Sequence, residues 1–214
     1  MFFLIALVGI LIALLVRKLW RTDECTVLQT IRSGDARVEI VDDRCKEGLP
    51  HTTGPDTIRM IQRVWEGPRR DAVLTHERVH LAQRRDGSAW ADFYARGWGY
   101  VCQRRAPADI PADFVARLRP NPDTADAPWA IWRDRYVFFP AFTGDGSLRG
   151  AEVIVWDLEN HRQVGIPETW KAEFCGSGAC PHQYEHPHEI SAEWLSATPR
   201  PDSSAARKLF AWNK

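Results

Sequence analysis

The chain has 214 residues, a length that suits one domain and is too short for a multi-domain machine. Its 28 Lys and Arg side chains balance 28 Asp and Glu side chains, so the formal net charge at pH 7 is zero. No overall field attracts a phosphate backbone, and a nucleic acid is therefore not expected as a partner. The 14 Pro, 14 Gly and 10 Trp indicate many turns and aromatic packing, which favours an α+β domain.

The N-terminal residues form an apolar run. Residues 1–16 carry no charged or polar side chain, and residues 17–21 add a basic and aromatic border. Neither a basic segment before the run nor a small-x-small cleavage site after it is present, so the pattern is typical of a membrane anchor rather than a signal peptide. We therefore predict a single-pass transmembrane helix at residues 1–21 and a membrane localisation. The side of the membrane stays open, because the basic border favours a cytoplasmic domain and a Cys175–Cys180 disulfide would favour an oxidising compartment.

The remaining chain is predicted to comprise a juxtamembrane linker (22–36), one domain (37–198) and a tail (199–214). Period-2 alternation predicts strands, and apolar residues at three- and four-residue spacings predict helices. The expected strands are 37–41, 57–64, 135–142 and 151–157, the last two as a hairpin, and the expected helices are 70–85, 89–105 and one that begins at Pro187. Residues 107–128 are expected to be a surface connection with a short helix at 113–118, and residues 209–212 could dock onto the domain.

The sequence His76-Glu-Arg-Val-His80 is an HExxH pattern inside the predicted 70–85 helix. Residues four apart share one face of a helix, so both imidazoles can bind one zinc ion, and Glu77 can act as general base. Gln83 follows on the same side of the helix, where it could line the site or face solvent. The pattern therefore predicts a Zn²⁺ cofactor.

A catalytic zinc site usually has three protein ligands, so a third must come from elsewhere in the chain. Asp86 lies six residues after His80, at the position of the third ligand in the metzincin pattern HExxHxxGxxH. That pattern needs a Gly where this chain has Gln83, so the helix should continue and carry Asp86 away from the metal. Asp86 is therefore the alternative third ligand.

Glu189 and Glu193 lie four residues apart on the helix predicted to begin at Pro187. With the HExxH, they make the chain resemble the gluzincin metallopeptidases, the thermolysin-like group, in which ExxxD on a second helix completes the site. The resemblance implies an α+β zincin-like domain with a small β-sheet, in which His76, His80 and Glu189 bind zinc and Glu193 orients a ligand imidazole. The chain is also similar to small zincin domains in which HExxH is followed by an apolar residue, any residue and Gln, as in His80-Leu-Ala-Gln83, and a later helix carries Pro-x-Glu-x-x-Ala, as in Pro187-His-Glu-Ile-Ser-Ala192.

The expected function is that of a membrane-anchored zinc metallopeptidase that hydrolyses a peptide or protein substrate, with Glu77 as general base. Residues 57–64 are expected to form an edge strand that holds the substrate in extended form. The sequence identifies no oxyanion donor; the candidates by proximity are His182, Tyr184, His186 and His188.

The alternative is a non-enzymatic membrane-attached domain. Cys175 and Cys180 bracket a short Gly-Ser-Gly-Ala loop, so they could form a disulfide or bind a structural zinc ion together with a nearby His. In this alternative the fold holds that structural zinc, or no metal at all, and has no activity.

Overall fold

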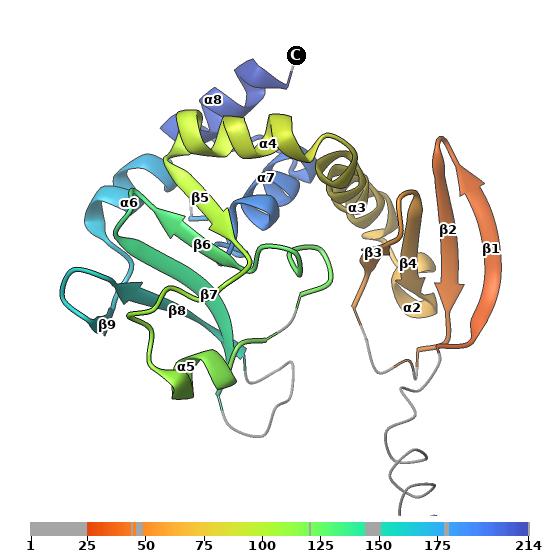
Figure 1. The fold of residues 1–214 in the computed structure, drawn as a ribbon. Helices are drawn as coiled ribbons and strands as arrows, with labels where there is room; N and C mark the ends of the chain where they lie inside the picture. The colour runs from red at the N-terminus through yellow and green to blue at the C-terminus, as the bar shows by residue number, and fades with distance from the viewer. Residues whose placement is uncertain are drawn as a thin grey trace, which may run out of the picture.

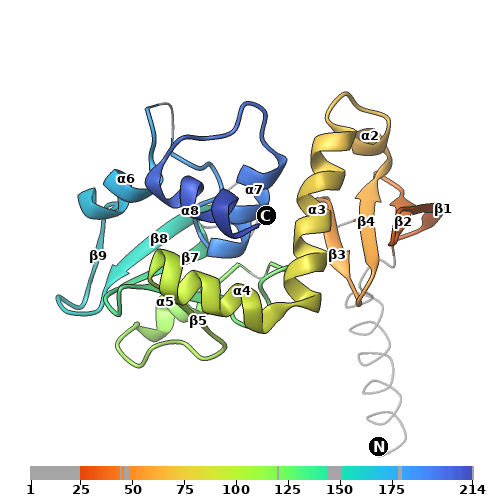
Figure 2. The ribbon, with the colours of Figure 1, turned by 90° about the horizontal axis from the view of Figure 1, so that it is seen from above.

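The structure is a computed structural model that describes residues 25–43, 45, 49–119, 121–143, 151–177 and 180–213. Two β-sheets lie at opposite ends of the fold, and helices α3 (Arg70–Arg85) and α7 (Pro187–Ser196) lie side by side between them (Figures 1 and 2). The fold class is therefore α+β with two sheets, rather than the one small sheet that the sequence predicted.

The first sheet has the strand order β1-β2-β4-β3. Its strands are β1 (Val27–Ser33), β2 (Ala36–Val41), β3 (His51–Thr53) and β4 (Thr57–Ile61). Strands β2 and β4 are parallel, and the two outer pairs are antiparallel. Val38 and Met60 pack with Leu74 and Leu81 of α3, so the sheet fixes the orientation of that helix.

The second sheet is an antiparallel meander in chain order. Its strands are β5 (Tyr100–Gln103), β6 (Trp129–Trp132), β7 (Tyr136–Phe142), β8 (Ala151–Asp157) and β9 (Arg162–Val164). Both faces of β7 are covered: Val137 and Phe139 belong to one apolar cluster, and Phe138 belongs to another. Successive side chains of β7 point to opposite faces of the sheet and therefore pack into two different apolar clusters.

Helix α2 lies beside strands β2 and β4 of the first sheet, and the other remaining helical segments surround the second sheet and α3. They are α2 (Gln62–Trp65), α4 (Gly87–Phe93), the π-helical turn η1 (Tyr94–Trp98), α5 (Ala112–Ala116), α6 (Glu168–Phe174) and α8 (Ser204–Trp212). Trp98, Trp170 and Trp194 are buried in one aromatic cluster with helix α7, which explains much of the high Trp content.

The predicted 70–85 helix and the 135–142/151–157 hairpin are confirmed. The predicted 89–105 helix ends early, because Gly99 adopts a φ of 74° and turns the chain into β5. The predicted 57–64 strand ends at Ile61, and β4 lies between β2 and β3 rather than at an edge. The expectation that it holds a substrate is therefore wrong, because its backbone groups are used on both sides.

Two segments predicted to flank the domain belong to the fold. Strand β1, inside the predicted 22–36 linker, pairs with β2. Helix α8, inside the predicted tail, begins after Ser203, whose hydroxyl accepts the N–H of Ala206 as a helix cap. Leu209 of α8 is fully buried in the aromatic cluster.

The predicted membrane anchor requires a correction of the fold class and of the localisation. The segment 1–21 lies outside the described residues. Among the residues that are described, no helix is both long enough and apolar enough to cross a bilayer. The predicted single-pass anchor and membrane localisation therefore receive no support from the part of the chain that the structure describes.

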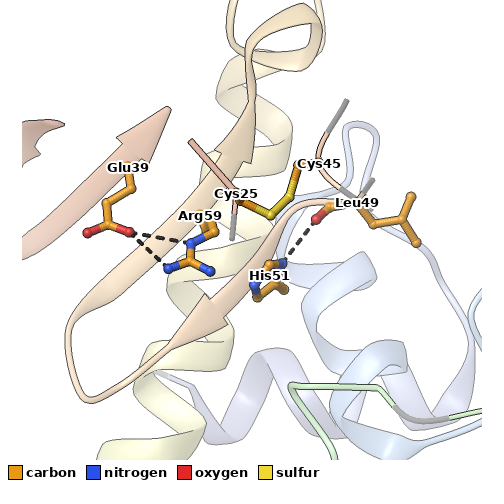
Figure 3. The surroundings of a disulfide bond; sticks show 6 residues. All are labelled: Cys25, Glu39, Cys45, Leu49, His51 and Arg59. Carbon is orange, nitrogen blue, oxygen red and sulfur yellow. Dashed lines mark hydrogen bonds and ion pairs between the residues drawn. A yellow bond between two sulfur atoms is a disulfide. The ribbon is translucent and has the colours of Figure 1, made fainter. Parts of the chain in front are cut away.

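Two disulfides cross-link the described chain. Cys25 pairs with Cys45, close to the segment Leu49–His51 in which the His51 Nδ1 donates to the Leu49 carbonyl (Figure 3). Cys175 pairs with Cys180, so these two sulfur atoms are not thiolate ligands and the alternative of a structural zinc at this loop is not supported. Disulfides persist in oxidising compartments, and a domain with two of them suits such a setting.

Candidate metal centre

A cleft of about 560 Å³ lies where α3, α7 and the segment before β6 meet. Helix α3 contributes His76, Glu77 and His80 to its wall. Helix α7 contributes Glu189 and Glu193. The cleft thus brings together side chains that are more than one hundred positions apart in the sequence.

Three potential ligand atoms converge inside this cleft. The Nε2 atoms of His76 and His80 are 3.0 Å apart, and Oε2 of Glu189 lies 3.3 Å from the first and 3.5 Å from the second. Ligand atoms bound tetrahedrally to zinc at about 2.0 to 2.1 Å are about 3.3 Å apart. His76, His80 and Glu189 therefore have the donor types and the spacing of a three-ligand zinc site.

Helix α3 separates its packing residues from its polar ones. Leu74 and Leu81 point to the first sheet, whereas His76 and His80, one turn apart, point to the cleft. His80 is 1% exposed and the His76 side chain is 16% exposed, so solvent can reach the pair from one side.

Helix α7 begins in a way that favours an anion at its start. The His186 Nδ1 accepts the N–H of His188 as a cap, and Pro187 occupies the first turn. Glu189 follows in that first turn, where the helix dipole stabilises a carboxylate. The local sequence therefore both starts the helix and presents the third ligand.

Gln83 orients one of the imidazoles. Its Oε1 accepts a hydrogen bond of 2.7 Å from His80 Nδ1, which leaves Nε2 free to bind a metal. Its Nε2 lies 2.9 Å from the Ser191 hydroxyl and 3.1 Å from both the Tyr94 hydroxyl and the His188 carbonyl. Gln83 is 2% exposed, so it links α3 to α7 inside the protein rather than facing solvent.

Two residues that the sequence analysis did not identify complete the surroundings. Asn121 Nδ2 donates to Oε1 of Glu189 at 2.8 Å, so that the other oxygen, Oε2, faces the imidazoles. Asp123 accepts from the backbone N–H and the hydroxyl of Thr52 and from Arg84. Both lie in the stretch predicted to be a surface connection, where no periodicity distinguishes them from ordinary turn residues.

Glu77 is almost fully buried, and its Oε2 has no hydrogen-bond partner among the described residues. Burial raises the pKa of its carboxyl group to about 8, although the charge of His80 opposes this. A buried oxygen without a partner is rare in folded proteins and suggests that a further group belongs beside it.

The charges of His80 and Glu189 depend on each other. Burial alone would lower the pKa of His80, but the charge of Glu189 and its hydrogen bond raise it to about 10. Burial likewise opposes the charged form of Glu189, but His80 and His76 hold the pKa of its carboxyl group well below the usual value. Without a metal the pair is therefore an imidazolium and a carboxylate, and a bound cation would take the place of the proton.

The other predicted site residues lie elsewhere. The carboxylate of Glu193 accepts the backbone N–H groups of His182 and Gln183, and the partner of the His80 imidazole is Gln83 instead. Asp86 follows the last residue of α3, where its side chain is 58% exposed and pairs with Arg85. The helix does continue past Gln83, which is why Asp86 lies away from the ligand cluster.

The residues considered as oxyanion donors do not line the cleft. Tyr184 packs against Phe138 and Trp170 in the aromatic cluster. His186 Nε2 donates to the Ala127 carbonyl, His188 Nδ1 lies near the Asp123 carbonyl, and His182 is exposed. Burial lowers the pKa of both His186 and His188, so the two are neutral near pH 7.

No protein-family model matches the chain, and no curated protein or solved structure is significantly similar to it.

Substitution of Gln83 by Leu should lower the free energy of unfolding by about 2 to 4 kcal/mol, because it leaves buried polar groups of Tyr94, Ser191 and His80 short of a partner. Urea denaturation measures the change. Gln62→Leu is the matched control, since among the described residues the Gln62 side chain bonds only to the exposed Glu66, and a change below about 0.5 kcal/mol is expected. Equal losses in the two variants would contradict a linking role for Gln83.

Proposed function

We propose that this protein is a zinc-dependent metallopeptidase in which His76, His80 and Glu189 bind the metal. The observation that carries the proposal is the convergence of their three ligand atoms at 3.0 to 3.5 Å in an open cleft. Two imidazoles and one carboxylate form a ligand set that zinc uses in catalytic sites, where a fourth position stays open.

The buried Glu77 supports a catalytic rather than a purely structural metal. Glu77 follows His76 on α3 and lines the same cleft, and one of its oxygens lacks a partner in the described chain. A structural zinc site is usually closed by four protein ligands and needs no unpaired acid beside it. When bound, zinc supplies Lewis acidity, lowering the pKa of a water molecule toward neutrality and polarising a carbonyl group.

The remaining roles, which are proton transfer, orientation of the metal-binding side chains and exclusion of water, belong to residues of the chain. In its ionised form Glu77 can take a proton from water and pass it to the leaving amine, and the positive charge of a bound cation would favour that form by lowering the pKa from about 8. Asn121 orients the carboxylate of Glu189, and Gln83 orients the imidazole of His80, so that each can bind the metal. The cleft, bordered by Leu49–His51, excludes part of the bulk water around these groups.

The substrate we propose is a peptide or protein segment. Strand β3 is the edge of the first sheet beside the cleft, but its outward-facing Thr52 already binds Asp123 through its N–H and Arg84 through its carbonyl. Addition of a substrate strand along β3 would have to displace these contacts. We therefore propose that the substrate lies in the cleft itself, between α3 and the segment that carries Asn121.

A non-enzymatic domain is the competing hypothesis, because His80 and Glu189 also satisfy each other as a buried ion pair without any metal. Metal content separates the two. Elemental analysis of the purified full chain should give one zinc per molecule, and Glu189→Gln should weaken zinc binding by at least about tenfold. Asp86→Asn, which removes the same charge from an exposed site, should leave the zinc content unchanged. If the folded chain contained no zinc after incubation with zinc, this result would contradict the proposal.

Substitution of Glu77 by Gln should lower kcat for peptide hydrolysis by about 10² to 10⁴-fold, because it removes the general base. The zinc content should stay at one per chain, and the fold should be kept, because Gln has the shape of the protonated acid. The measurement is a peptide cleavage assay with parallel elemental analysis. Unchanged cleavage in the Glu77→Gln variant would contradict the assigned role of Glu77.

The affinity for zinc should rise by about tenfold or more per pH unit between pH 7 and 9. The reason is that the pKa of His80 in the metal-free protein is raised to about 10, so that zinc must displace its proton throughout this range. Competition with a chelator of known pH dependence measures the slope. Glu189→Gln removes the group that raises this pKa and should flatten the slope above pH 7. A slope near zero in the unmodified protein would argue against the assignment of His80.

A further inference from the structure

Arg119 lines the cleft beside the ligand cluster, and its guanidinium makes no hydrogen bond to the described residues. Its side chain is 16% exposed, and its Nε is buried without a partner. The carboxylate of Glu185 lies 3.8 Å from Nη2, which is within ion-pair range but too long for a hydrogen bond. Buried donors of this kind are normally satisfied, so a ligand is the natural partner of this guanidinium.

Neighbouring arginines use their donors within the protein. Arg84, whose side chain is 31% exposed, donates to the carbonyls of Thr52 and Pro122 and pairs with Asp123. Arg117, two residues before Arg119, does not line the cleft and donates to the Phe142 carbonyl and to Glu152. Arg84 and Arg117 are thus explained by structure, whereas Arg119 is not.

The backbone holds Arg119 in place. Its N–H donates to the Pro140 carbonyl at 2.9 Å, and the preceding residue, Leu118, bridges to Ala141 of β7. Two residues later, Asn121 binds the proposed ligand Glu189. Two residues span at most about 7 Å, so Arg119 borders the part of the cleft next to the ligand cluster.

We propose that Arg119 is a specificity-determining residue that binds a carboxylate of the substrate, supplied either by the C-terminus of a peptide or by an acidic side chain. This inference rests on the proposed function, since it places the substrate in the same cleft. A guanidinium presents donors in a fork that matches a carboxylate, and a partly desolvated one favours an anion over a neutral carbonyl.

Arg69 also lines the cleft, but it is exposed, whereas the Arg119 side chain is mostly buried and so binds an anion with less competition from water. The carboxylates of Glu193 and Asp123 already accept hydrogen bonds from backbone N–H groups. Glu185 is a weak counter-ion, because burial and the charge of Glu189 raise its pKa to about 7. A substrate carboxylate would therefore meet an incompletely neutralised cation.

Binding can be measured without turnover in the zinc-loaded full chain that carries Glu77→Gln. The probes are N-acetylated tetra-alanine with a free C-terminal carboxylate, the same peptide with a C-terminal amide, and two C-terminally amidated tetrapeptides that differ only in one Glu or Gln. Isothermal titration calorimetry gives their dissociation constants before and after the additional substitution Arg119→Met. Arg117→Met is the matched control, because Arg117 does not line the cleft.

We expect one carboxylate probe to bind at least about tenfold more tightly than its neutral partner, because a charge-assisted, bidentate pair contributes at least that factor. Preference for the free acid over the amide identifies a C-terminal carboxylate, and preference for Glu over Gln identifies a side chain. Arg119→Met should abolish the preference and leave the neutral probes unaffected, whereas Arg117→Met should preserve it. The double variant Arg119→Met/Glu185→Gln repeats the test, because it removes the buried acid that pairs with Arg119 together with Arg119 itself.

Equal binding of charged and neutral probes would overturn the inference, as would a preference that survives Arg119→Met, which would place the carboxylate on the metal. Failure of the proposed function has a different signature. The chain with Glu77 intact would then cleave no peptide, while the Arg119-dependent preference for a carboxylate would still be measured.

Discussion

The structure depends on the burial of ionisable side chains where α3 meets α7. His80 and Glu189 are almost fully enclosed, and buried charges cost several kcal/mol unless each is paired and hydrogen-bonded. Gln83 meets this requirement on the imidazole side and Asn121 meets it on the carboxylate side. Gln83 also contacts the His188 carbonyl and the Ser191 hydroxyl of α7, so polar contacts of fixed length hold the two helices at a set distance, which is what a metal site needs from its scaffold.

The two helices are held by different cores. α3 packs on the first sheet through Leu74 and Leu81, and α7 packs into the aromatic cluster through Ile190 and Trp194. The candidate metal centre lies at the junction of these cores, where side chains from two independently packed elements can converge while solvent keeps access. Gln83 then acts as a bridge between the two cores through its contacts with the start of α7.

Local patterns in the sequence were sufficient to identify the helices and hence the ligand candidates. The HExxH spacing and the Pro187 start each define one helix face, so His76, His80 and Glu189 could be named before their proximity was known. The orienting role was expected of Glu193, and the structure has Gln83 next to His80 instead, because angular position alone does not reveal which polar residue is buried. Asn121 could not be predicted, since its position follows from pairing of the preceding residues with β7.

That same pairing positions residues of both the proposed metal site and the proposed substrate site. The segment that begins beside β7 carries Arg119, Asn121 and Asp123 at every second position, and all three line the cleft. Asn121 holds the carboxylate of Glu189, and Asp123 holds the edge strand through Thr52. A shift of this segment would move Glu189, the cleft wall and the Arg119 guanidinium together. The orientation of Glu189 and the position of Arg119 are therefore coupled through this one segment, so a shift of it would affect both the proposed metal site and the proposed carboxylate site.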